Sequence, residues 1–238
     1  MKPLLDSGIW LNLDSVDSTQ NYANRCVEQN LSECPSVVFT THQTAGRGRF
    51  DRKWLEEPGS NIAMTMVFKE YADHPKPWLI GMSVAAAAAK VLNCQLQWPN
   101  DLVLAWRKLG GILTEIITSS EGTKIPVVGI GVNLNTMHFP TEIATRAISL
   151  AQHFSLQFDP LAISEKIVHQ LEELPEPDEW HVLKPIWEEF DATRGKQYKT
   201  NDGKIVIARG IGDCAQLIGS VDGKEHTVFA ADAFFDLH

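Results

Sequence analysis

The segment with the clearest chemical character is residues 45–54, AGRGRFDRKW. It gathers four basic side chains in a chain whose net charge is −9. Gly46 and Gly48 allow the backbone to turn and leave amide N–H groups open to an anion. Each arginine can bind a carboxylate or a phosphate through forked N–H donors. These arginines are Arg47, Arg49 and Arg52. The pattern predicts a loop that closes over an anionic ligand, with a solvated surface loop or a nucleic-acid-binding loop as alternatives.

A second candidate is residues 98–113, WPNDLVLAWRKLGGIL. Its proline fixes φ and removes a backbone donor, which predicts a rigid corner between two strands. If the segment after this corner forms a hairpin, Asp101 and Lys108 come from its two arms and can face each other. Lys108 is a compact charge that suits a phosphate or a carboxylate, although a structural salt bridge is the alternative. Gly110 and Gly111 indicate a close approach of a ligand or of another backbone.

Two further segments carry weaker signals. The hydroxyls of residues 18–20, STQ, can cap a helix or donate to a polar ligand group. In residues 129–135, GIGVNLN, the glycines leave room for a planar ring and Asn133 can hydrogen-bond it; simple strand packing is the alternative. The segment does not match GxGxxG, so it does not predict a dinucleotide site.

Composition limits the classes of function. A pI near 5.3 argues against a general affinity for nucleic acids or anionic membranes. The four cysteines are scattered and no metal-binding spacing appears, which predicts buried free thiols in a reducing cytoplasm and no protein metal site. No signal peptide or membrane span is expected, and nothing ahead of residue 8 is long enough for a DNA-binding domain.

Apolar periodicity predicts an α+β fold in which a mixed sheet is flanked by helices. A helix is expected over 18–30 with Ser18 or Thr19 as its N-cap, and an alanine-rich helix over 77–92. Residues 141–190 are predicted to be helical, with Pro160 at the start of one helix. The expected strands are 8–15, 36–41, 61–68, 94–98, 101–106, 108–118 and 125–135.

After residue 195 the pattern changes to short strands separated by Asp-Gly turns, which predicts a small β-barrel. We therefore expect two domains, residues 1–192 and 193–238, with the boundary near 191–195. Trp106, Trp180 and Trp187 are interpreted as packing residues.

Taken in order, the segments GRGRFDRKW, WPNDL, KLGGIL and GIGVNLN resemble the motifs of the biotin protein ligases. The resemblance covers about residues 15–135. It implies an ATP-dependent enzyme that activates biotin as biotinyl-5′-AMP and transfers it to a lysine of a biotin carrier domain, of the acetyl-CoA carboxylase type. It further implies a short form without an N-terminal DNA-binding domain, a C-terminal SH3-like β-barrel, a cytoplasmic location and Mg²⁺ accompanying ATP. A homodimer is the base-rate expectation.

The resemblance also implies roles for individual residues. Lys108 and Arg49 would stabilise charge on the α-phosphate, and Asp101 would orient the acceptor lysine or take a proton from it. The residues implied at the biotin end are Ser18, Thr19, Gln20, Gln43, Gly46, Arg47, Gly48, Arg49, Lys108 and Gly111. Those implied at the nucleotide end are Arg47, Arg52, Trp54 and Asn133.

Three positions depart from the family pattern. Gln20 stands where the family usually has Asn, and Asp51 where it often has Gly. Gln97 replaces a Lys, which removes a positive charge and leads us to expect weaker anion binding.

Two other functions compete with biotin attachment. One is a lipoate or octanoate protein ligase or transferase, which also needs a carboxylate or acyl pocket and an acceptor lysine. The other is a non-catalytic nucleic-acid-binding module that uses the basic loop, against which the net charge of −9 counts.

Overall fold

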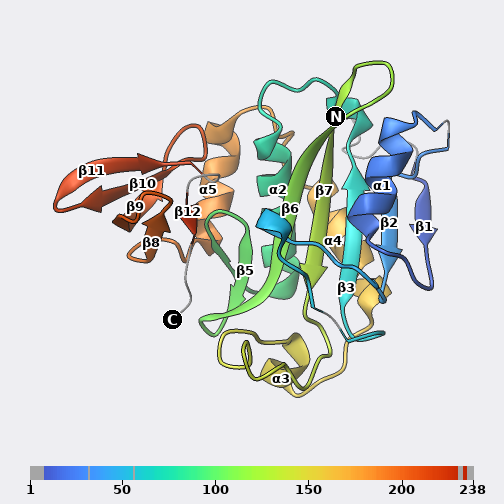
Figure 1. Ribbon diagram of the computed structural model, residues 1–238, viewed down its shortest axis with the longest axis horizontal. Coiled ribbons are helices and arrows are strands. Elements are labelled where there is room, and N and C mark those ends of the chain that lie inside the picture. Colours follow the sequence, from blue (N-terminus) through green and yellow to red (C-terminus); the bar gives the residue numbers. More distant parts are fainter. Residues whose placement is uncertain (1–7, 32, 56, 230–232, 235–238) are drawn as a thin grey trace.

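A seven-stranded mixed sheet forms the centre of the larger part of this computed structural model, which describes residues 8–31, 33–55, 57–229 and 233–234 (Figure 1). The strand order is β1-β2-β3-β7-β6-β5-β4, with β1 parallel to β2 and the other neighbours antiparallel. The strands are β1 Trp10–Asn12, β2 Val37–Thr40, β3 Ile62–Val67, β4 Gln95–Gln97, β5 Asp101–Leu104, β6 Arg107–Thr118 and β7 Lys124–Val132. The prediction of an α+β fold with a mixed sheet is confirmed.

Helices lie on both faces of this sheet (Figure 1). They are α1 Thr19–Glu28, α2 Trp78–Leu92, α3 Leu150–Phe154, α4 Pro160–Glu172 and α5 Trp180–Phe190, with short 3-10 turns η1 Arg49–Asp51 and η2 Lys69–Tyr71. Successive side chains of a strand point to opposite faces. On β6, Glu115 contacts α1, whereas Thr114 lies against Gly81 of α2. The helices α1 and α2 therefore cover opposite faces.

The alanine run of α2 explains how tightly one face is covered. Residues 85–89 are five alanines, and each is at most 2% exposed. Small side chains let a helix approach its neighbours closely, and α2 packs against both the sheet and α4. The resulting core continues into α4 and α5, where Ile167, Leu171 and Trp187 are fully buried.

The prediction for 141–190 is only partly correct. Residues 141–146 form turns, and helix begins at Leu150, where the Ser149 hydroxyl caps α3 by accepting from the Gln152 N–H at 3.0 Å. Pro160 does begin α4, with Asp159 as its N-cap. Ile143 and Arg146 of these turns, together with Ala147, line the cavity described below.

The C-terminal segment forms a separate antiparallel sheet, as expected. Its strand order is β11-β10-β9-β8-β12, from β8 Gln197–Thr200, β9 Ile205–Ile211, β10 Leu217–Val221, β11 Lys224–Val228 and β12 Ala233–Phe234. Trp98 joins it to the larger sheet: its N–H donates to Thr193 Oγ1 at 2.9 Å and its indole Nε1 to the Ala215 carbonyl at 2.8 Å. The Tyr198 hydroxyl donates back to the Trp98 carbonyl at 2.9 Å. The peptide between Trp98 and Pro99 is cis.

Two smaller expectations are wrong. Cys214 is exposed, unlike Cys26, Cys34 and Cys94, which are buried free thiols. Trp106 is 65% exposed at the turn between β5 and β6, where the Lys196 ammonium lies 4.4 Å from the ring centroid.

In the described ranges, no helix combines the length and apolar character needed to cross a bilayer.

The C-terminal sheet yields a stability prediction. A Cβ added at Gly219 would lie 2.3 Å from Val206 Cγ1 and 2.7 Å from the Ile207 carbonyl oxygen. Gly219→Ala should therefore lower the free energy of unfolding by about 1–3 kcal/mol, measured by urea denaturation. The control is Gly210→Ala on the neighbouring strand, where the nearest atom is 3.7 Å away; it should change stability by less than about 0.5 kcal/mol. Equal effects would contradict the packing argument.

Candidate active site

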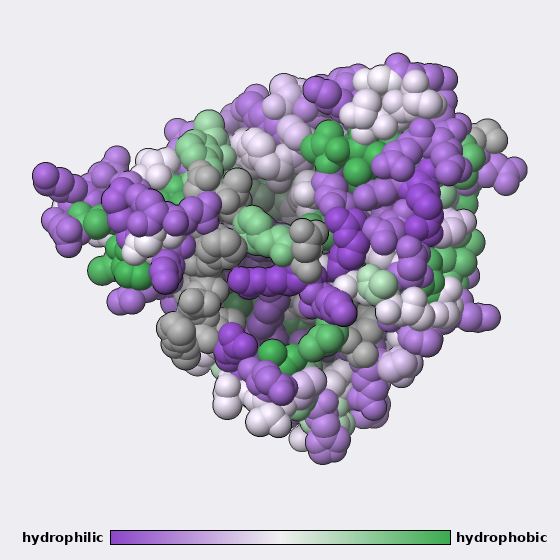
Figure 2. All heavy atoms as spheres, viewed as in Figure 1, coloured by the Kyte–Doolittle hydropathy of each residue, from purple (hydrophilic) through white to green (hydrophobic). Residues whose placement is uncertain are grey.

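A cavity of about 500 Å³ lies on the α1 face, between α1, the glycine-arginine loop (residues 45–54) and strands β3, β5, β6 and β7. Figure 2 shows strongly hydrophilic side chains beside hydrophobic ones at the centre of this face. The predicted site residues that line the cavity are Ser18, Thr19, Gln20, Gln43, Arg47, Gly48, Arg49, Arg52, Trp54, Asp101, Lys108, Gly111 and Asn133. Segments distant in sequence thus meet around one space.

Gly46 is the predicted residue that does not line the cavity. It is a buried residue near the start of the loop, where an added Cβ would lie 2.8 Å from the Trp54 carbonyl oxygen and 3.0 Å from Gln43 Nε2. Its absence of a side chain lets the loop close on itself, since the Trp54 N–H donates to the Gly46 carbonyl at 2.9 Å.

The inner end of the cavity is a polar floor formed by Thr19, Gln20, Gln43 and Thr65. The Thr19 N–H and hydroxyl lie 2.9 and 3.3 Å from Gln43 Oε1, to which both donate. The Thr65 hydroxyl lies 2.9 Å from Thr19 Oγ1 and 3.3 Å from Gln20 Oε1. Thr19, Gln20 and Thr65 are at most 3% exposed, so their polar atoms are removed from bulk water. These groups are hydrogen-bonded to one another, and their oxygens keep further acceptor capacity that a ligand at this end can use.

Thr65 was missed by sequence reasoning. It lies in the apolar strand IAMTMV, which reads as buried packing, and no local motif marks it. The signal that could have found it is a single hydroxyl residue in an otherwise apolar buried strand. Ser18 serves as the predicted cap of α1, since its hydroxyl accepts from the Asn21 N–H at 3.4 Å.

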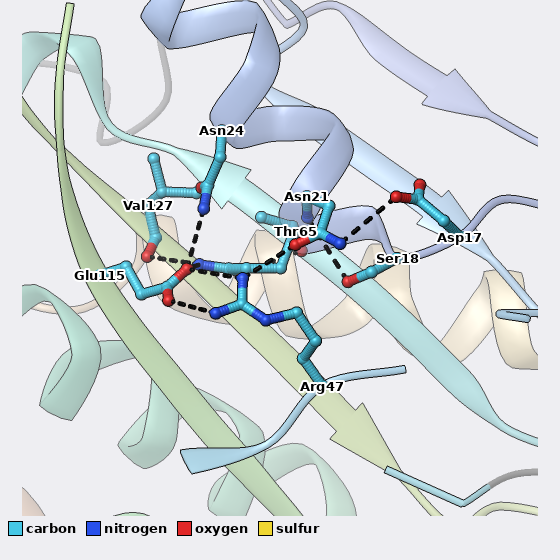
Figure 3. Close-up of polar contacts among 9 residues, drawn as sticks. Asp17, Ser18, Asn21, Asn24, Arg47, Thr65, Glu115 and Val127 are labelled. Atoms are coloured by element: carbon cyan, nitrogen blue, oxygen red, sulfur yellow. Dashed lines mark hydrogen bonds and ion pairs between the residues drawn. The ribbon is translucent and has the colours of Figure 1, made fainter. Parts of the chain in front are cut away.

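Arg47 contacts α1 and β6. Its NH2 lies 2.9 Å from Glu115 Oε1, and its NH1 donates to Asn21 Oδ1 at 2.8 Å (Figure 3). Its guanidinium therefore bridges the loop to α1 and β6. Glu115 had no motif of its own and was also missed.

The outer end of the cavity is cationic. Arg49 NH1 donates to Asn100 Oδ1 at 3.1 Å, and its guanidinium stacks 4.7 Å from the Phe50 ring centroid. Burial lowers the pKa of Arg49, an effect that nearby Asp101 opposes and Arg52 reinforces. An arginine nevertheless stays protonated at neutral pH, so the side chain brings a partly desolvated positive charge to the cavity.

The hairpin predicted for residues 101–111 is confirmed. Strands β5 and β6 pair with a register shift between Leu102 and Val103, and Lys108 Nζ lies 2.6 Å from Asp101 Oδ1. Both side chains line the cavity, beside the corner at Asn100. The Asn100 side chain donates to the Ile112 carbonyl at 2.6 Å, which ties the corner to β6. The acid and the base therefore do face each other at the cavity wall.

Trp54 lies against Gly131: a Cβ added at Gly131 would be 2.7 Å from Cε2 of the Trp54 ring. The space left by this glycine is therefore filled by a ring of the protein itself. Asn133 is 5% exposed and its Nδ2 donates to the Ile148 carbonyl at 3.2 Å.

The three departures from the family pattern are placed differently. Gln20 is part of the polar floor. Gln97 is 1% exposed on β4 and is not among the described lining residues, and neither of its amide atoms has a hydrogen-bond partner in the described ranges. Gln97 therefore does not contact the cavity directly. The side chain of Asp51 lies outside the described part of the structure.

The fold and cavity together define a class of protein, which comparisons with known proteins identify. Residues 13–135, just over half of the chain, match the model of the biotin/lipoate A/B protein ligase family. The chain belongs to this family.

Curated relatives agree with this assignment, and a solved structure shares the fold. The chain is 29% identical over 188 residues to the bifunctional ligase/repressor BirA of Bacillus spizizenii, covering 74% of this chain and 58% of that protein. It is 27% identical to the biotin–[acetyl-CoA-carboxylase] ligase of Mycobacterium tuberculosis, covering 82% and 77%. The fold matches a biotin protein ligase from Aquifex aeolicus, solved with biotin and ATP, at a TM-score of 0.76 and 22% identity, covering 96% and 98%.

The contact between Trp54 and Gly131 yields a prediction about the loop. Gly131→Ala should displace the indole and loosen the loop that Trp54 ends, so trypsin should cut among Arg47–Lys53 at least about tenfold faster, detected by fragment mass. Gly111→Ala is the control, because it lies opposite Gly131 in the β6–β7 register and its added Cβ would meet nothing closer than 3.6 Å. Unchanged cleavage in Gly131→Ala would show that Trp54 does not secure the loop.

Proposed function

We propose that this chain is an ATP-dependent biotin protein ligase. The observation that carries the proposal is the polar floor of Thr19, Gln20, Gln43 and Thr65 at one end of a cavity whose other end is cationic. Thr19, Gln20 and Thr65 of this floor are buried. Biotin has a ureido ring with two N–H donors and a carbonyl acceptor at one end, and a carboxylate at the other. The cavity offers matching groups at both ends.

The same floor favours biotin over lipoate or octanoate. A dithiolane ring or an alkyl chain has no strong hydrogen-bonding groups, so it could not use the remaining donor and acceptor capacity of these hydroxyls and amides. A site built to hydrogen-bond its substrate rejects an analogue that lacks the partner group, by up to about 10⁴-fold. The names of the M. tuberculosis relative and the A. aeolicus structure also refer to biotin.

In the first step a biotin carboxylate oxygen attacks the α-phosphorus of ATP, and pyrophosphate leaves. Both reactants are anions, so their approach must be offset by positive charge. Arg49, Arg52 and Lys108 line the cationic end, and their charges would stabilise the transition state without reorganisation of water. The glycine-arginine loop would exclude water from the biotinyl-AMP formed.

In the second step the amine of an acceptor lysine attacks the carbonyl carbon of the mixed anhydride, and AMP leaves. Asp101 lies at the cavity wall, where its carboxylate would orient the incoming ammonium and accept a proton. The acceptor we propose is the biotin carrier domain of a carboxylase, bound transiently in the cytoplasm.

Mg²⁺ would accompany ATP in this reaction. Across the described ranges no three His, Cys, Asp or Glu side chains are grouped so as to hold a metal ion. In ATP sites Mg²⁺ is commonly held by phosphates, water and one or two carboxylates.

Biotin-dependent exchange of label between pyrophosphate and ATP tests the proposal. The unaltered protein should catalyse this exchange and form biotinyl-AMP, whereas Arg49→Ala and Lys108→Ala should lower the rate at least about 100-fold while circular dichroism shows a folded protein. Exchange that depends on lipoate or octanoate would overturn the choice of substrate. Salt-dependent DNA binding without exchange would favour a nucleic-acid-binding module.

The polar floor yields a second prediction. Thr65→Val removes the hydroxyl that contacts Thr19 and Gln20 but keeps the side-chain volume, so the KM for biotin should rise about tenfold. Thr65→Ser keeps the hydroxyl and should stay within about threefold of the unaltered protein. If steady-state kinetics give both variants the same KM, the floor does not recognise the ring.

A further inference from the structure

Glu115 of β6 collects donors from two elements on the cavity side of the sheet (Figure 3). Its Oε2 accepts from Gln20 Nε2 at 3.0 Å and from Asn24 Nδ2 at 2.9 Å, both on α1. Its Oε1 pairs with Arg47 of the glycine-arginine loop at 2.9 Å. The carboxylate is itself outside the described lining of the cavity, but two of its partners, Gln20 and Arg47, belong to that lining.

The first consequence concerns the amide of Gln20. A carboxylate can only accept hydrogen bonds, and the Val127 carbonyl, 3.3 Å from the same Nε2, can also only accept. Gln20 must therefore turn its NH₂ toward Glu115 and its Oε1 toward Thr65 and Gly129. Glu115 thus makes this part of the cavity floor a hydrogen-bond acceptor, the polarity that a ring N–H requires.

The second consequence concerns the loop. Arg47 donates to Glu115 and Asn21, so the guanidinium anchors the base of the loop to β6 and α1. The Gly48 N–H donates to the Arg52 carbonyl at 2.7 Å, which closes the tip of the loop. Phe50, between these two residues, is exposed. An anchor at the base positions Arg49, two residues further along, at the cationic end of the cavity.

We propose that Glu115 is a positioning residue that sets ring recognition and loop closure together, through Gln20 and Arg47. The proposal rests on the proposed biotin ligase function and adds a residue that no sequence motif marked. Burial raises the pKa of Glu115, but the hydrogen bonds from Asn24 and Gln20 and the charge of Arg47 outweigh it and hold the pKa below its usual value. The carboxylate is therefore ionised at neutral pH, as the geometry requires.

Glu115→Gln tests the proposal with little change of volume. The new amide can present an NH₂ to Gln20, which would turn the Gln20 amide and change the floor from acceptor to donor, and it loses the charge that holds Arg47. Biotin binding without ATP, measured by calorimetry, should weaken at least about tenfold, with a larger effect on the KM for biotin than on that for ATP. Trypsin cleavage after Arg47 should accelerate at least about tenfold in the same variant.

Glu121→Gln is the matched control. Glu121 accepts from Asn30 Nδ2 at 2.7 Å and so also ties the region after α1 to the end of β6, but it is exposed and outside the cavity lining. It should leave biotin binding and loop cleavage unchanged. Gln20→Leu separates the two effects, because it should weaken biotin binding and leave the cleavage rate unchanged.

A folded Glu115→Gln protein that binds biotin as tightly as the unaltered protein, or whose loop is cut no faster, would overturn the proposal. A variant with a lower melting temperature but the same biotin affinity would assign Glu115 a structural role only, which also overturns it. If the unaltered protein binds no biotin, the proposed function itself fails, and this outcome is distinct from the others.

Discussion

Strand β6 supports both the hydrophobic core and the cavity, because successive side chains of a strand point to opposite faces. Gly111, Leu113 and Glu115 lie on the side of α1 and the cavity. Ile112, which packs in the core and also lines the cavity, and Thr114, which meets α2, form the other set. A shift of register by one residue would exchange these two sets. The long pairing of β6 with β7, from Gly110 to Thr118, holds this register. The position of the charged and polar groups of the site therefore follows from the same pairing that builds the core.

The positive charge of this site is local, and two of its cations are paired with carboxylates. The chain is acidic overall, with a net charge of −9, yet the cavity gathers Arg47, Arg49, Arg52 and Lys108. Arg47 is paired with Glu115, and Lys108 with Asp101. A paired cation fixes geometry as well as potential, because the partner carboxylate restricts where the charge can lie. The basic loop is thus better described as an anchored loop with a cationic wall than as a uniformly positive patch.

Family membership places these features in context without deciding the whole activity. The chain spans 58% of the length of the Bacillus relatives that it matches. The family unites biotin and lipoate ligases, so the substrate must be argued from the cavity of this chain. The hydroxyl of Thr65 and the oriented amide of Gln20 make that argument, since a ring or chain without hydrogen-bonding groups cannot pair with them.

Local sequence was sufficient wherever the physics is local. Ser18 caps α1, Pro160 begins α4, and the strands from 61–68 to 125–135 were found from their apolar patterns. The pairing of Asp101 with Lys108 was also predictable, because a hairpin sets the separation of its two arms. Helix was predicted too early after residue 141, because polar turns and weakly periodic helix look alike in composition.

Only the tertiary structure decided which residues, distant in sequence, bind the same carboxylate or line the same cavity. Glu115 carries no motif, and its partner Arg47 is 68 residues away in sequence. Gln97 seemed close to the site by sequence but is buried away from the cavity lining, whereas Trp106 seemed a packing residue but is exposed. The chain by itself determined periodicities, caps and turns, which depend on neighbours along the backbone. Side-chain partners across the sheet depend on strand order and register, and these are set by burial of the whole core.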